Sequence, residues 1–115
     1  MDKLNLLFIC NQGENRSRTG ASIYKHKHFT KFAGFYSFDK KKLLTEEMLK
    51  WSQIIFVMEK RHVEELYNAY PEYYFEKRVV NLDIPDVYCF GNAELKKILK
   101  KGVDESLKEL EHLLL

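Results

Sequence analysis

A cysteine, an arginine and a serine stand at a spacing that suits the chemistry of phosphate esters. Cys10 is followed by Asn11-Gln12-Gly13-Glu14-Asn15 and then by Arg16 and Ser17. Five residues can wrap so that their backbone N–H groups point inward, and such a ring at the start of a helix binds a tetrahedral oxyanion. Arg16 would grip two phosphate oxygens with its planar guanidinium group. The stretch 11–17 is therefore the candidate phosphate-binding segment.

Cys10 is the candidate nucleophile of this segment. The positive field that holds phosphate also favours the thiolate of Cys10, and Ser17 can donate a hydrogen bond to it. A thiolate beneath a bound phosphate is placed to form a cysteinyl-phosphate. The loop N–H groups and Arg16 carry the phosphate charge, so no metal and no cofactor is implied.

The elements that must position these residues alternate between strands and helices. Apolar runs predict four strands, and amphipathic stretches predict the helices between and after them. The expected strands are Leu4–Ile9, Phe32–Ser37, Ile54–Met58 and Val79–Ile84. The expected helices are 16–27, a stretch capped by Thr45, 60–70 ending before Pro71, and a leucine-rich tail that is one helix or is broken at Gly102.

This order predicts an α/β fold, a three-layer αβα sandwich around a four-stranded parallel sheet. Cys10 follows the first strand and Arg16 opens the first helix, so the phosphate loop lies between them. Ligands bind at that edge of such sheets.

Composition narrows the class of protein further. The 115 residues suit one domain, taken as residues 1–115. A formal net charge of +2 gives no electrostatic argument for a nucleic-acid partner, and no apolar run approaches the roughly 20 residues of a membrane helix. The start Met1-Asp2-Lys3 lacks a secretory pattern, so a cytoplasmic protein is expected, with its oligomeric state open.

Four segments in the same order resemble the low-molecular-weight protein tyrosine phosphatase superfamily, and within it the small prokaryotic branch of predicted tyrosine phosphatases. L-L-F-I-C-x5-R-S is similar to the family's phosphate loop, and Ala33-Gly34 falls at its second-strand "AG". The stretch from Trp51 to His62 is similar to the branch's "WADVIFVME…H" segment, and the stretch from Leu82 to Tyr88 to its "LDIPDDY" loop. The likeness covers nearly the whole chain.

The resemblance implies an aspartate on a late loop that protonates the leaving group and then activates water. Asp86 to Cys89 aligns with the family's D-P-Y-Y-like segment, which favours Asp86 as this general acid and leaves Asp83 as a residue that braces the loop. Tyr88 and Cys89 would then lie at the rim of the site. Cys89 is either a small apolar residue packed beside its neighbours or a disulfide partner that shields Cys10 from overoxidation.

Three positions depart from the family pattern. Gly13 stands where the family commonly has an asparagine that braces the loop, and glycine tolerates positive φ without bracing anything. Glu14 is expected to point to solvent, away from the phosphate. Arg18 replaces the usual proline and adds positive charge near the mouth.

The sequence therefore predicts a phosphomonoesterase that acts on a phosphorylated protein, at phosphotyrosine, or on a small aryl phosphate. One alternative is a weakly active or inactive phosphate-binding regulatory module. Another is an arsenate reductase-like or redox-sensing thiol protein, against which the lack of a third cysteine argues. No metal site is expected, because His26, His28, His62 and His112 lack the spacing of zinc ligands and are expected to face solvent.

Overall fold

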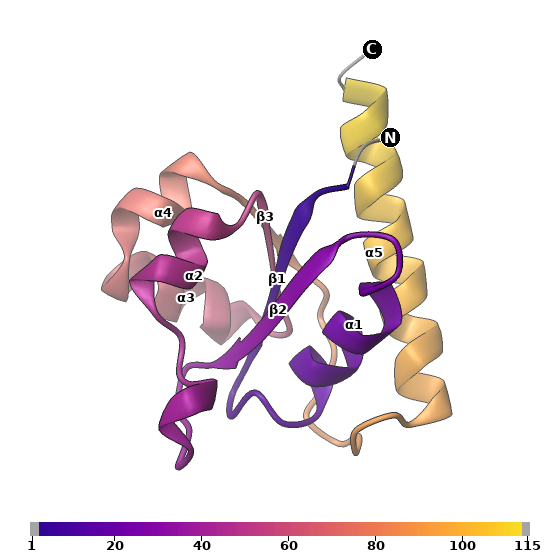
Figure 1. The fold of residues 1–115 in the computed structure, drawn as a ribbon, viewed down its shortest axis with the longest axis horizontal. Coiled ribbons are helices and arrows are strands. Elements are labelled where there is room, and N and C mark those ends of the chain that lie inside the picture. The colour runs from indigo at the N-terminus through magenta and orange to yellow at the C-terminus, as the bar shows by residue number, and fades with distance from the viewer. Residues whose placement is uncertain (1–2, 114–115) are drawn as a thin grey trace.

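The computed structural model describes residues 3–113 and contains a four-stranded, all-parallel sheet (Figure 1). The strands are β1 (Asn5–Cys10), β2 (Phe29–Gly34), β3 (Ile54–Val57) and β4 (Arg78–Asn81). Their order across the sheet is β2-β1-β3-β4, so β1 lies in the interior. Its side chains are buried on both faces of the sheet from Leu6 onward, which explains its continuous apolar run.

Helices cover both faces of the sheet, and the expected three-layer αβα sandwich is confirmed (Figure 1). On one face lie α1 (Arg16–Tyr24) and α5 (Ala93–Leu113), which pack on Leu6 and Phe8 of β1. On the other face lie α2 (Glu46–Trp51), α3 (Lys60–Ala69) and α4 (Pro71–Glu76), which pack on Leu7 and Ile9.

The second strand begins three residues earlier than the sequence predicted. Pairing with β1 sets its register, from Asn5 opposite Phe29 to Cys10 opposite Gly34. Phe35 and Tyr36 lie beyond the end of β1, and their N–H groups bind the carbonyls of Cys10 and Asn11 at 3.1 and 2.8 Å. These two residues therefore support the first turn of the phosphate loop instead of extending the strand.

Helix boundaries follow their capping residues. The Thr45 hydroxyl accepts the N–H of Met48 at 3.2 Å, which confirms the predicted cap of α2. Pro71 ends α3, as predicted, but it also opens α4, a short helix that the sequence reading missed; proline suits the first helical position because no N–H is needed there. A 3₁₀ turn, η1 (Lys40–Lys42), follows β2.

Up to Leu113, the last described residue, the leucine-rich tail is one helix; Leu114 lies outside the described residues. α5 runs without a break through Gly102, where a Cβ would lie 2.9 Å from a methyl group of Leu82. Gly102 thus lets the chain that follows β4 pass close to the helix, and it does not end the helix. None of the helices within residues 3–113 combines the length and the apolar character needed to cross a bilayer.

Candidate functional site

The structure brings most of the predicted site residues to one hollow at the carboxyl edge of β1. This cavity of about 260 Å³ is lined by Cys10, Asn11, Gln12, Glu14, Asn15, Arg16 and Asp86. Asp86 comes from the loop after β4, whereas Asp83 does not line the cavity. Ser17 is fully buried behind the cysteine, with its Oγ 3.1 Å from the Cys10 Sγ.

Two glycines let the phosphate loop lie against the end of β2. Gly13 has a φ of +69°, which glycine adopts readily because it has no Cβ. A Cβ at this position would lie 2.8 Å from the carbonyl carbon of Ala33. A Cβ on Gly34 would lie 2.7 Å from the backbone nitrogen of Gly13. The two backbones therefore touch at a place where neither can carry a side chain.

Arg16 is almost completely buried, and only part of its guanidinium group has a protein partner. Its Nη1 donates to the Glu59 carboxylate at 2.8 Å and to the Ile84 carbonyl at 2.7 Å. Its Nε and Nη2 have no hydrogen-bond partner among residues 3–113. A buried guanidinium with two free donors beside a cavity is arranged to receive an oxyanion with two oxygens, because buried donors are normally satisfied.

Glu59 fixes the guanidinium plane and partly offsets its charge. Burial alone would raise the pKa of Glu59, but hydrogen bonds and positive charges from Arg16 and Arg61 outweigh it and lower that pKa. The carboxylate is therefore ionised when it holds Arg16. Sequence reasoning did not select Glu59, although it lies in the segment that carries the family resemblance.

His62 is fully buried, so the expectation that it faces solvent is wrong. Its Nδ1 accepts the N–H groups of Met58 and Glu59 at 3.3 and 3.1 Å, so its proton is on Nε2, which donates to Asn11 Oδ1 at 2.6 Å. Burial, and after it the charge of Arg16, lowers the His62 pKa to about 4. A neutral histidine therefore anchors the first residue of the loop.

Asn11 extends this chain of hydrogen bonds to Asp86. Its Nδ2 donates to one Asp86 oxygen at 3.2 Å, while the other Asp86 oxygen lies 3.6 Å from the Arg16 Nε. Half of the Asp86 side chain remains exposed. The carboxyl group is thus held over the cavity and still has access to water.

The start of α1 fastens the loop that carries Asp86. The Asn15 side chain accepts the N–H of Phe90 at 3.1 Å, and the Thr19 hydroxyl accepts the N–H of Gly91 at 3.0 Å. Arg18 lies over the Phe90 ring, 3.9 Å from its centroid. Asn15 therefore does not cap α1 with its side chain but holds the loop at the rim.

The remaining predicted residues are placed as follows. Glu14 is exposed, lines the cavity at its rim and forms an ion pair with Lys42 at 3.6 Å. Tyr88 is partly buried and packs against the core on the face of the sheet that α1 and α5 cover. Cys89 is exposed, so its expected packing as a small apolar residue is wrong, and it and the buried Cys10 are both free thiols.

The fold is that of the low-molecular-weight protein tyrosine phosphatases. A protein of this name from T. tengcongensis shares 21% identity at a TM-score of 0.72 over 93% of this chain and 99% of that one. A protein tyrosine phosphatase from Entamoeba histolytica shares 20% sequence identity at a TM-score of 0.75, over 98% of this chain and 100% of that one. The YwlE arginine phosphatase from Geobacillus stearothermophilus shares 16% identity at a TM-score of 0.65, over 95% of this chain and 97% of that one. No protein-family model and no curated protein matches the sequence.

Proposed function

We propose that this protein is a phosphomonoesterase that forms a cysteinyl-phosphate intermediate and acts on phosphotyrosine or a similar aryl phosphate. The observation that carries the proposal is the Arg16 guanidinium, which is buried with two free donors in the cavity that Cys10 also lines. A buried guanidinium next to a thiol, with two nitrogen donors that have no hydrogen-bond partner, suits a phosphate ester better than a neutral ligand.

In the first step a phosphate monoester would enter the loop 11–16 and accept hydrogen bonds from backbone N–H groups and from Arg16. The Cys10 thiolate, with the Ser17 hydroxyl 3.1 Å away as a donor, attacks phosphorus. The S–P bond forms as the bond to the ester oxygen breaks, and Asp86 gives its proton to that oxygen.

In the second step the same groups would hydrolyse the intermediate. Asp86, now a carboxylate, takes a proton from a water molecule, whose oxygen attacks phosphorus as the S–P bond breaks. Inorganic phosphate leaves and the Cys10 thiolate is restored. The 51% exposure of the Asp86 side chain gives water a route to this carboxylate.

The test is hydrolysis of p-nitrophenyl phosphate and phenyl phosphate by the wild type and three variants. Cys10→Ser should remove turnover while phosphate still binds, as measured by calorimetry. Asp86→Asn should lower kcat by about 10²- to 10⁴-fold on phenyl phosphate, whose leaving group needs a proton, and by less on the nitrophenyl ester. Asp83→Asn, a matched change on the same loop, should leave both rates near the wild-type values.

Two results would refute the proposal. Turnover that is equal in the wild type and in Cys10→Ser would exclude the cysteinyl-phosphate. Phosphate binding without any turnover by the wild type would indicate instead the phosphate-binding regulatory module. We do not propose a redox relay, because the second cysteine, Cys89, is exposed rather than buried beside Cys10.

A further inference from the structure

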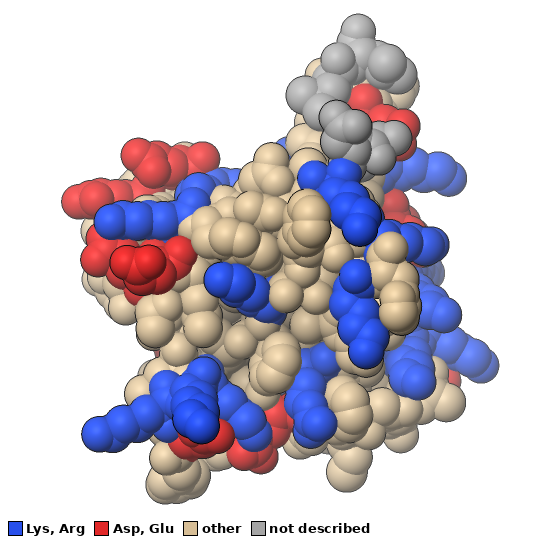
Figure 2. Space-filling view, in the orientation of Figure 1, with Lys and Arg blue, Asp and Glu red and all other residues tan. Residues whose placement is uncertain are grey.

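Charge is strongly segregated in this chain, although its formal net charge is only +2. No acidic residue occurs from Arg16 to Phe38, a stretch that contains five basic ones. The stretch 46–76, which forms α2, β3, α3 and α4, holds seven acidic and three basic residues. Figure 2 shows basic side chains prevailing over the side of the molecule where Figure 1 places α1 and α5. A near-neutral protein thus has a basic side.

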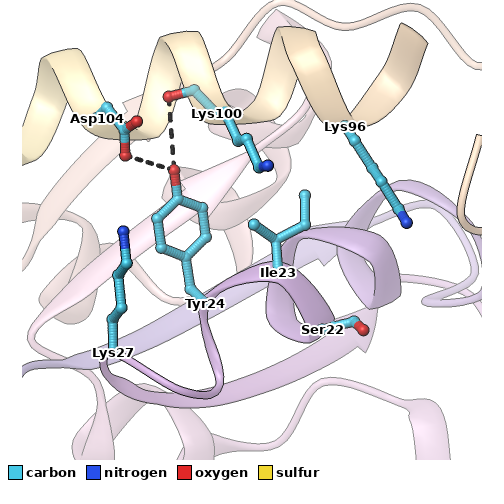
Figure 3. Close-up of a pocket in the computed structure, with 7 residues that line it drawn as sticks. All are labelled: Ser22, Ile23, Tyr24, Lys27, Lys96, Lys100 and Asp104. Atoms are coloured by element: carbon cyan, nitrogen blue, oxygen red, sulfur yellow. Dashed lines mark hydrogen bonds between the residues drawn. The ribbon is translucent and has the colours of Figure 1, made fainter. Parts of the chain in front are cut away.

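A hollow of about 400 Å³ between α1 and α5 concentrates this charge (Figure 3). Its lining includes three lysines, Lys27 after α1 and Lys96 and Lys100 one turn apart on α5. None of the three has a carboxylate oxygen of residues 3–113 within 4.0 Å. The hollow therefore offers uncompensated ammonium groups from two elements.

The one carboxylate in the hollow is already engaged. Asp104 accepts the Tyr24 hydroxyl at 2.6 Å, and that hydroxyl also lies 3.4 Å from the Lys100 carbonyl (Figure 3). The pKa of the nearby His28 is lowered, first by burial and then by the positive charges of Lys27 and Lys3. The local field thus favours an anion from outside the chain.

A line of residues on α1 and at its C-cap connects this hollow with the rim of the candidate active site. Arg18, Ser22 and Lys25 follow one another at helical spacing and line a second hollow of about 290 Å³. Ser22 also lines the first hollow, so the two adjoin. At the other end Arg18 stacks on Phe90, in the loop that carries Asp86. We call Arg18, Lys25, Lys27, Lys96 and Lys100 the basic strip.

We propose that the basic strip binds acidic side chains of a phosphoprotein substrate and so selects phosphorylated residues with aspartate or glutamate nearby. The inference rests on the proposed function, because the strip gains this meaning from starting at the rim of the phosphate site. α1 rises about 1.5 Å per residue and is about 13 Å long, whereas an extended peptide covers about 3.4 Å per residue. The acidic side chains should therefore lie about three to six residues from the phosphorylated one.

The test uses phosphotyrosyl peptides with glutamates about three to six residues before or after the phosphotyrosine, and a neutral peptide with glutamines there. Affinity is measured by fluorescence anisotropy on the Cys10→Ser protein, and KM and kcat on the active one. At low salt, one of the two acidic peptides, with glutamates either before or after the phosphotyrosine, should bind about ten-fold more tightly than the neutral peptide. This difference in affinity should shrink as the salt concentration rises.

The triple variant Lys27→Ala, Lys96→Ala, Lys100→Ala should abolish that difference with kcat and p-nitrophenyl phosphate hydrolysis unchanged. The matched control removes three other charges of α5 that do not line the hollow, with Lys97→Ala, Lys101→Ala and Lys108→Ala, and should keep it.

Equal binding of acidic and neutral peptides to the Cys10→Ser protein, or equal loss in the control triple variant, would overturn the proposal. So would an RNA oligonucleotide that binds the strip more tightly than either peptide. Failure of the proposed function looks different, because the wild type would then not hydrolyse p-nitrophenyl phosphate at all, while the anisotropy experiment would still report on the strip.

Discussion

Replacing His62 by asparagine should change how the stability of the protein depends on pH. His62 is fully buried, and its Nδ1 accepts two backbone N–H groups, from Met58 and Glu59. Asparagine keeps an acceptor close to the position of Nδ1 but has no titratable group and does not reach Asn11. The substitution therefore removes the titration while leaving part of the hydrogen bonding at the start of α3.

The size of the effect follows from the His62 pKa, which is about 4 in the folded protein and 6.5 in an unfolded chain. Between these values the unfolded state binds a proton that the folded state excludes, so stability falls as the pH falls from 6.5 towards 4. Above pH 6.5 the histidine is neutral in both states and contributes no pH dependence. The full loss below pH 4 is about 3 kcal/mol.

The assay is urea unfolding of the wild type and His62→Asn at several values between about pH 7 and about pH 4. The wild type should lose about 3 kcal/mol more than the variant over this interval, although it is the more stable protein at neutral pH. Glu59, whose pKa is lowered from 4.5, adds an acid loss that begins near that pH and that both proteins share. Parallel stability curves for the two proteins would refute a neutral, buried His62.

Two further substitutions test the packing of the loop and of α1. Gly34→Ala should destabilise the protein by about 1–3 kcal/mol in urea unfolding and weaken phosphate binding in calorimetry, because the new Cβ meets the backbone of Gly13. In the control Gly102→Ala the new Cβ meets only the end of the Leu82 side chain, so phosphate binding should not change. Tyr24→Phe should cost about 1 kcal/mol of stability by removing the hydrogen bond to Asp104, without changing p-nitrophenyl phosphate hydrolysis.

Local sequence signals predicted the layers of this fold well, and its boundaries less well. The apolar run of β1 and the cap at Thr45 are read directly from residue types. The start of β2 depends on its register with β1, a contact between residues 24 apart in the chain that no local pattern encodes. Pro71 suits both the end of one helix and the first position of the next, so the residue type alone does not predict that α4 begins there.

The site shows the same division between local and distant information. The spacing from Cys10 to Arg16 predicts the loop, and the family resemblance favours Asp86, which lies in a segment far along the chain. The lack of metal-ligand spacing around His62 favours a side chain that faces solvent. Its burial depends instead on the loop that packs over it, more than 50 residues away in sequence. The sequence signal for a role of His62 in the site is its position at the end of the segment from Trp51 to His62, which carries the family resemblance and also contains Glu59.

The hydrogen bonds of Asn11 explain how this loop can do without an asparagine at position 13. Gly13 has no side chain to brace the loop, and its contact with Ala33 and Gly34 leaves no room for one. The brace lies instead directly after the cysteine, where Asn11 joins His62 on one side and Asp86 on the other. Because a single amide holds both the loop and the proposed acid, a change at Asn11 should disturb phosphate binding and proton transfer together. If the loop were braced by a side chain at position 13, a substitution there would disturb phosphate binding without disturbing proton transfer by Asp86.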